Sequence, residues 1–214
     1  MVKSDLAHDT WENMAYDKEL IAGKLRRWEK YLSKFRLPEW ESIPDIGLYM
    51  EQTVVLLRQY IDYLPPELKD GQVITATAIN NYIRLKLLPP PVKKRYYRVH
   101  IAYLIIICTL KQNLSLSMLP KIIPTGISEE EVRKVYTAFA RRHAMATGYF
   151  AGQVQSMAAP ILGRKAECSL ATEDTNEIIA TSAILSCFSR LLAEKLILLD
   201  GRTLADGDSI EIEE

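Results

Sequence analysis

Between Gly71 and Ser128 the sequence has no aspartate and no glutamate, although these two residue types account for 27 of its 214 positions. The same stretch holds eight lysines and arginines, six of them between Arg84 and Arg98. A buried apolar segment would also have few acids, but burial does not explain so dense a group of cations. The zero net charge of the chain therefore combines a basic centre with acidic flanks. This pattern favours the binding of a polyanion.

Cysteine is scarce, and long apolar runs are missing. The three cysteines, Cys108, Cys168 and Cys187, are odd in number and have apolar neighbours, which predicts reduced core thiols rather than a disulfide framework. The first residues, Met1–Ala15, carry four charged side chains and no apolar run, so we expect no signal peptide. The most apolar segment, Val99–Leu110, is too short to span a bilayer. We therefore expect a cytoplasmic protein with no membrane segment.

The sequence also lacks the common signatures of catalysis and of cofactor binding. It contains no P-loop, GxGxxG, HExxH, nucleophile elbow or CxxC pair. The histidines at His8, His100 and His143 are dispersed. His143 falls on an apolar helix face, where a core role is more common than a metal-binding or catalytic one. We expect no enzymatic activity, no cofactor and no metal site.

Apolar residues recur three and four positions apart along most of the chain, and this spacing predicts an all-α fold. Asp45 is the expected N-cap of the second helix, and Pro89-Pro90-Pro91 excludes helix after the third. The other predicted helices cover Met14–Lys34, Thr75 or Thr77 to Lys86, Tyr97–Asn113, Leu116–Ile122, Ser128–Ala159 and Thr175–Leu199.

The C-terminal part begins with a capping-box pattern at Ser128–Glu131. A small residue occupies every fourth position of the helix that follows, a spacing that allows another helix to approach closely. This small-residue line consists of Ala140, Ala144, Gly148, Gly152 and Ser156. It suits a dimer interface and packing inside one subunit equally well. We divide the chain into an N-terminal region that contains the basic centre (residues 1–125), a helical dimerisation or sensor region (126–205) and an acidic tail (206–214).

The segment Ile74–Leu119 has the order of elements of a winged helix-turn-helix: a short helix, a proline-rich basic turn, a long helix and a short one. Asparagine and arginine bind base edges, whereas lysines on a stiff loop suit the DNA backbone. The residues that we predict to bind nucleic acid are Thr75, Thr77, Asn80, Asn81, Arg84, Lys86, Lys93, Lys94, Arg95, Tyr96 and Arg98.

This segment resembles the DNA-binding domain of the MerR family of bacterial regulators. The matching positions are Ile79 and Tyr82 in the recognition helix, Leu87-Leu88-Pro89 in the turn, Lys94-Arg95-Tyr96 in the wing and Leu114–Leu119 at the start of the short helix. The sequence departs from the family at Asn80, Asn81 and Lys86, where the family has an arginine, a tyrosine and the turn glycine. The resemblance implies a MerR-like core that binds duplex DNA.

A wider stretch, Trp40–Pro124, is similar to a family of uncharacterised bacterial proteins known as a domain of unknown function. The similarity is carried by the strings DIGLYMEQ at Asp45–Gln52 and INNYI at Ile79–Ile83. Members of this family carry the MerR-like segment, so the resemblance implies a DNA-binding regulator with no known ligand. The residues after Gly126 resemble no family.

Two functions are compatible with these patterns. The first is a dimeric transcription regulator that binds double-stranded DNA and has an unknown small-molecule effector, if any. The second is a protein-interaction module without enzymatic activity, whose basic centre binds an acidic partner protein. The cluster of Thr77, Asn80, Asn81 and Arg84 favours the regulator, because an acidic partner requires cations but no amides.

Overall fold

The structure is a computed structural model that describes residues 17–63, 74–112, 114–157, 162, 181, 183–192, 199 and 202–203. Its elements are α2 (Lys18–Lys34), η1 (Trp40–Ser42), α3 (Met50–Tyr60), α5 (Ala76–Arg84), α6 (Arg98–Leu110), η2 (Leu119–Lys121) and α7 (Glu129–Met157). A further helical stretch covers residues 183–192. The predicted all-α class is therefore confirmed. The β-type pairing in the described ranges is limited to two isolated bridges, Leu48–Tyr96 and Val92–Arg95.

Helix α6 forms the centre of the fold. Every residue from His100 to Leu110 is buried, because this helix has an apolar sequence on all sides. Helices α3 and α7 both pack against it. Burial raises the pKa of the Cys108 thiol to about 12, and both Cys108 and Cys187 are buried and outside any disulfide, as expected for reduced core thiols. Within the described residues, no helix is both long and apolar enough to cross a membrane.

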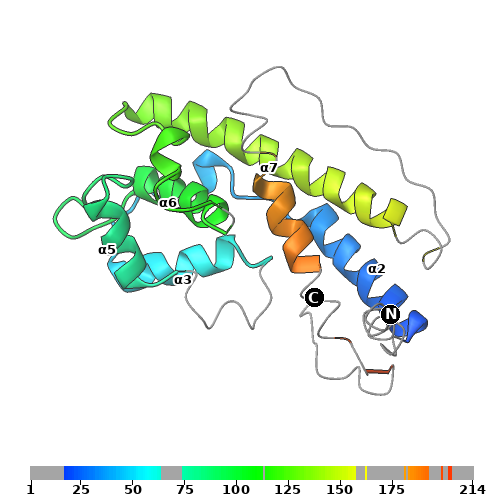
Figure 1. The fold of residues 1–214 in the computed structure, drawn as a ribbon. Coiled ribbons are helices and arrows are strands. Elements are labelled where there is room, and N and C mark those ends of the chain that lie inside the picture. Colours follow the sequence, from blue (N-terminus) through cyan, green and yellow to red (C-terminus); the bar gives the residue numbers. More distant parts are fainter. Residues whose placement is uncertain are drawn as a thin grey trace, which may run out of the picture.

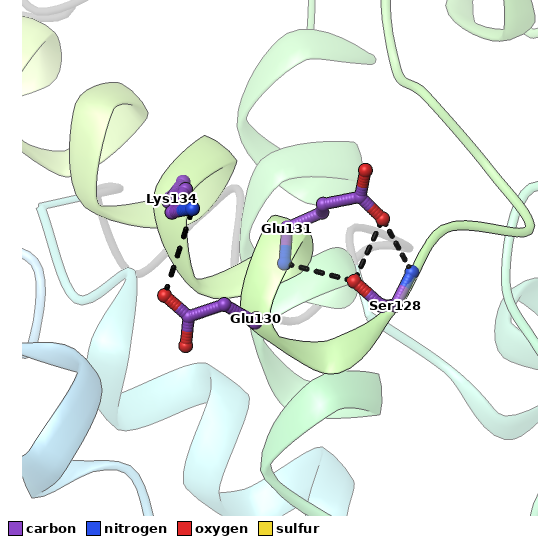
Figure 2. Close-up of polar contacts among 4 residues, drawn as sticks. All are labelled: Ser128, Glu130, Glu131 and Lys134. Carbon is purple, nitrogen blue, oxygen red and sulfur yellow. Dashed lines mark hydrogen bonds and ion pairs between the residues drawn. The ribbon is translucent and has the colours of Figure 1, made fainter.

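Helix α7 runs along the molecule and packs against α6 near its start and against α2 further on (Figure 1). Its first turn has the predicted capping box. The Ser128 backbone N–H donates to the Glu131 carboxylate at 2.8 Å, and the Glu131 N–H donates to the Ser128 hydroxyl at 3.3 Å (Figure 2). The Ser128 hydroxyl also donates to the Glu131 carboxylate at 2.7 Å, and this bond, together with that of the Ser128 backbone N–H, lowers the pKa of Glu131. The Ser128 side chain thereby satisfies a backbone donor that the helix itself leaves without an acceptor.

The junction of α2, α7 and residues 183–192 is filled by aromatic side chains around His143. His143 is fully buried, and its ring centroid lies 5.6–6.4 Å from those of Tyr63, Phe35, Phe188 and Phe139. Neither ring nitrogen has a hydrogen-bond partner. Burial is the main reason why the pKa of His143 falls from 6.5 to about 4. His143 is thus a neutral core residue.

Several predicted boundaries need correction. Helix α3 begins at Met50 with Tyr49 as its N-cap, whereas Asp45 accepts a hydrogen bond from the Arg98 N–H at 3.3 Å and thus contacts the start of α6. The predicted helix at Leu116–Ile122 is a turn followed by the short η2, because Pro120 interrupts the backbone hydrogen bonding of a longer helix. Most of the helix predicted over 175–199 lies outside the described residues, as do Cys168 and the acidic tail.

Candidate nucleic-acid interface

Helix α5 separates its apolar from its polar residues. Thr75 caps it by accepting the Ala78 N–H at 3.1 Å, as predicted for a threonine at this position. Ile79 and Tyr82 are buried in the core. The solvent-exposed side carries Thr77, Asn80 and Arg84, and Asn81 is half-buried beside them. The division into inward and outward positions agrees with the apolar pattern of the sequence.

Asn81 and Arg84 are joined within the helix. The Arg84 guanidinium donates to the Asn81 side-chain oxygen at 2.7 Å. This bond holds the arginine along the exposed side of α5 and leaves other N–H groups of its fork available. The amide of Asn80 lies on the exposed side one residue before Asn81. Helix α5 therefore presents a neighbouring threonine, amide and guanidinium to solvent.

The C-terminal end of α5 closes in a Schellman motif. The Leu87 N–H donates to the Tyr82 carbonyl and the Lys86 N–H to the Ile83 carbonyl, both at 3.0 Å. This motif needs a residue in the left-handed region, and Lys86 takes that position with φ of 58°. Glycine is the usual residue there because it has no Cβ. Lys86 therefore occupies a position that is sterically unfavourable for a lysine.

The proline-rich segment ends in a two-residue hairpin. Val92 and Arg95 exchange two backbone hydrogen bonds, each at 3.0 Å. The residues between them, Lys93 and Lys94, both have positive φ, 49° and 63°, which is the geometry of a type I′ turn. Such turns strongly prefer asparagine and glycine. Both lysine side chains are exposed, so the tip of the hairpin carries two cations.

The hairpin is fastened to the segment before α3. Leu48 and Tyr96 form an antiparallel bridge, with hydrogen bonds of 2.9 and 2.8 Å. Tyr96 is 3% exposed, and its ring meets His100 edge to face with a centroid distance of 5.7 Å. The prediction that Tyr96 contacts nucleic acid therefore needs correction, because alternation along the bridged strand directs its side chain into the core.

Arg95 and Arg98 also make intramolecular contacts instead of facing solvent freely. Arg95 donates to the Gly47 carbonyl at 2.9 Å and to the Tyr49 hydroxyl at 2.8 Å, with its guanidinium 4.3 Å from the Tyr49 ring centroid. Arg98 donates to the Ile43 carbonyl at 2.8 Å. The two arginines tie the chain before α3 to the hairpin and to α6. Both arginines thus have a structural role, and their predicted contacts with the DNA backbone stay a prediction.

His100 is a positioning residue that the sequence pattern did not single out. Its Nδ1 accepts the Tyr97 N–H at 3.0 Å, and its Nε2 lies 3.1 Å from the Pro90 carbonyl. Because Nδ1 is an acceptor, the ring proton resides on Nε2 and is donated to Pro90. His100 thereby joins the first turn of α6 to the proline segment. A histidine three residues after the N-cap is the signal that could have indicated this role.

The exposed members of the predicted set lie at one end of the molecule, on α5 and on the loop that follows it (Figure 1). We call Lys86, Lys93 and Lys94 the turn lysines. They are the non-glycine residues with positive φ in the described ranges. Within the described part of the chain, none of the three lysines forms an ion pair with an acidic side chain. No aspartate or glutamate lies near them in the sequence either.

Comparison with curated proteins and with solved structures finds no match to this chain. One family profile matches: residues 38–139 are similar to the family described as Domain of unknown function (DUF1836). The matched range begins just before η1, includes α3, α5, the hairpin and α6, and ends within the first half of α7. The candidate interface therefore lies wholly inside the segment that is similar to this family of unknown function.

Proposed function

We propose that the protein is a DNA-binding transcription regulator that contacts duplex DNA through the exposed side of α5 and the turn lysines. In this proposal α5 is the recognition helix of a MerR-like core, α6 is the long helix that follows it, and the Val92–Arg95 hairpin is the wing. The packing of α3 against α5 and the bridge between Leu48 and Tyr96 support this assignment. A dimer in the cytoplasm is the form in which such a regulator would act.

The observation that carries the proposal is the backbone conformation of the turn lysines. A left-handed conformation costs a non-glycine residue about 1–2 kcal/mol. Lys86, Lys93 and Lys94 all adopt it, at positions where glycine or asparagine would remove the strain. Three cations at three such positions favour a role for the charges themselves. A ligand with closely spaced negative charges, such as the phosphate backbone, fits this role.

The side chains on the exposed side of α5 favour DNA over other polyanions as the ligand. Asn80 and Arg84 carry the donor and acceptor groups that pair with adenine and guanine edges in the major groove. An acidic protein would be held by the lysines alone and would gain little from the amide. The intrahelical bond between Arg84 and Asn81 keeps the guanidinium extended along the helix, so little side-chain entropy is lost on binding.

The decisive experiment replaces both hairpin lysines by glycine and measures duplex binding and stability together. Lys93→Gly/Lys94→Gly should raise the free energy of unfolding by about 1 kcal/mol, because glycine accepts positive φ. The same variant should bind random-sequence duplex more weakly, and its slope of log affinity against log salt should fall by about two. The control is Lys30→Ala, which removes an exposed lysine outside the interface. Alanine is used there because glycine would destabilise the helix that contains Lys30.

The outcomes separate the two functions. Absence of duplex binding by the wild type at low salt would end the regulator proposal. Competition of polyglutamate with duplex DNA at equal charge concentration would instead indicate that the basic surface recognises acidic protein. A double-glycine variant with unchanged DNA affinity would show that the hairpin does not touch the duplex.

A second experiment separates base recognition from backbone binding. Asn80→Ala should relax the sequence preference found by selection from random DNA, with a cost of about 1–3 kcal/mol at particular base pairs. Lys94→Ala should weaken binding to all sequences alike. Equal losses on every sequence for both variants would mean that α5 does not enter a groove.

A further inference from the structure

Helix α3 has an apolar groove on its exposed side. The groove has a volume of about 430 Å³, and its apolar lining consists of Pro44, Leu48, Val55 and Leu56. Val55, in the middle of α3, is 57% exposed. Ile46, which lies between two of the lining residues in the sequence, is 69% exposed. Exposed apolar side chains that gather around a groove indicate a binding surface, unlike single ones scattered over a protein.

Two charged residues on this side of α3 are complementary, but they cannot pair within the helix. Glu51 lines the groove near the start of α3, and Arg58 lies on the same face two turns later. The two positions are about 10 Å apart along the helix axis, which is too far for an ion pair. Both side chains are exposed, and in the described part of the chain neither forms an ion pair with another residue. Both charges are therefore available to a partner.

We propose that this groove binds the same groove of a second copy of the chain, with the two α3 helices antiparallel and Val55 at the two-fold axis. In a two-fold interface, each residue away from the axis meets a different residue of the other copy. Antiparallel pairing brings Glu51 of each copy opposite Arg58 of the other, whereas parallel pairing would oppose like charges. Each Val55 covers the groove of the other copy, so exposed apolar surface is removed from water.

The size of the contact indicates where it operates. Stable interfaces bury about 1,200–2,000 Å² in total. Helix α3 has only 11 residues and is about 16 Å long, so this contact is too small to hold two copies together by itself. It requires copies that are already held close to each other, which increases their effective concentration.

One DNA duplex supplies this condition. Helix α3 packs against α5, so the groove lies on the unit that carries the proposed DNA contacts (Figure 1). We therefore expect molecules at neighbouring positions on one duplex to bind cooperatively through α3. This setting rests on the proposed function, whereas the pairing of the two grooves does not. The contact also involves a different helix from the small-residue line on α7.

Disulfide crosslinking through one engineered cysteine tests the pairing. Val55→Cys should give a covalent dimer under mild oxidation, because position 55 faces its own copy across the axis. Gln59→Cys is the matched control. It lines the same groove, but antiparallel pairing would hold the two copies of position 59 about 12 Å apart along the helices. Val55→Cys should crosslink severalfold faster than Gln59→Cys, at a rate that rises with protein concentration, and the wild type gives the background from the native cysteines.

Charge reversal tests the proposed ion pairs. Glu51→Arg and Arg58→Glu are introduced separately into the Val55→Cys protein. Each variant alone should crosslink about fivefold more slowly, because both ends of the pairing then oppose like charges. An equal mixture of the two variants should recover the faster rate, since opposite charges face each other again. Circular dichroism checks that each variant remains helical.

Crosslinking of the free protein at high concentration decides the pairing whether or not the protein binds DNA. Equal rates for Val55→Cys and Gln59→Cys, or for Val55→Cys and the wild type, would overturn it and leave the groove to a different partner. A mixture no faster than either charge variant would overturn the antiparallel arrangement.

The setting on DNA is tested with two lengths of duplex. Val55→Cys should crosslink faster on a duplex that accommodates two molecules than on one that accommodates a single molecule. Equal rates for protein bound to both duplexes would overturn the cooperative setting. Absence of bound protein would count against the regulator proposal, and the result for the free protein would still decide the pairing.

Discussion

Gly47, in the segment before α3, packs closely against the side chain of Arg95. A Cβ at this position would come within 2.9 Å of the Arg95 Cβ and 2.7 Å of its Cδ, closer than such atoms approach in proteins. The hairpin limb and the segment before α3 can therefore bridge only because residue 47 has no side chain. Glycine is required at position 47 because a Cβ would clash with Arg95. The turn lysines show the opposite case, because glycine would relieve backbone strain at their positions and yet lysine occupies them.

We predict that Gly47→Ala destabilises the protein by about 1–3 kcal/mol, since the hairpin must shift and the bonds of Arg95 to Gly47 and Tyr49 are strained or lost. Urea-induced unfolding measures this loss. Gly23→Ala is the control, because a Cβ there meets no atom within 4 Å and lies on a helix that alanine favours. Equal stability of Gly47→Ala and the wild type would show that the hairpin is not packed on this segment.

His143 makes stability depend on pH. Its pKa is about 4 in the folded protein and near 6.5 when solvated, so the unfolded chain binds more protons between these values. Its contribution to stability is complete above pH 6.5 and falls as pH is lowered towards 4, by about 3 kcal/mol in all. Free energies of unfolding at pH 7, 5.5 and 4 should therefore decline less in His143→Leu than in the wild type. Parallel declines would place the acid sensitivity in the carboxylates.

At the scale of elements, α7 has the small-residue line on a partly exposed face. Gly148 is exposed, and Ala140, Ala144 and Gly152 are half-buried, so the line is not sealed inside the subunit. A Cβ at Gly148 would meet no atom within 4 Å. A larger side chain there is compatible with the folded subunit, which makes this position suitable for testing the proposed dimer.

We predict that Gly148→Leu converts a dimer into a monomer, because the larger side chain prevents a second α7 from approaching closely. Light scattering at micromolar concentration measures the mass, and circular dichroism checks that the helices remain. Duplex DNA affinity should fall, since one of two half-sites is lost. A monomeric wild type, or a variant that stays dimeric, would place any interface elsewhere.

The elements also show which features the sequence pattern could predict. Helix positions followed from apolar spacing and from caps such as Thr75 and Ser128, because these signals act within one or two turns. The role of Asp45 was missed because its partner, the Arg98 N–H, lies far along the chain. The structural roles of Arg95 and Arg98 were missed for the same reason. Cation density predicts a charged surface, but the contacts of each arginine depend on the tertiary fold.

At the scale of the whole molecule, the exposed polar side chains of α5 and the turn lysines lie in the cation-rich part of the sequence, as the charge pattern predicts. The left-handed backbone conformation of the turn lysines, by contrast, had no signal in the sequence. A lysine pair gives no hint of a type I′ turn, because asparagine and glycine are the residues that indicate it.

Helix α7, with 29 residues in one unbroken element, is about 43 Å long at 1.5 Å per residue. A rod of that length amplifies small rotations: a tilt of about 5° at one end displaces the other by about 4 Å. Displacements of this size are comparable to the distance between successive base pairs of duplex DNA. If the proposed DNA-binding dimer forms, a change in the packing of α7 on α2 would thus be sufficient to move its two DNA-binding units in or out of register with their half-sites, without any rearrangement inside either unit.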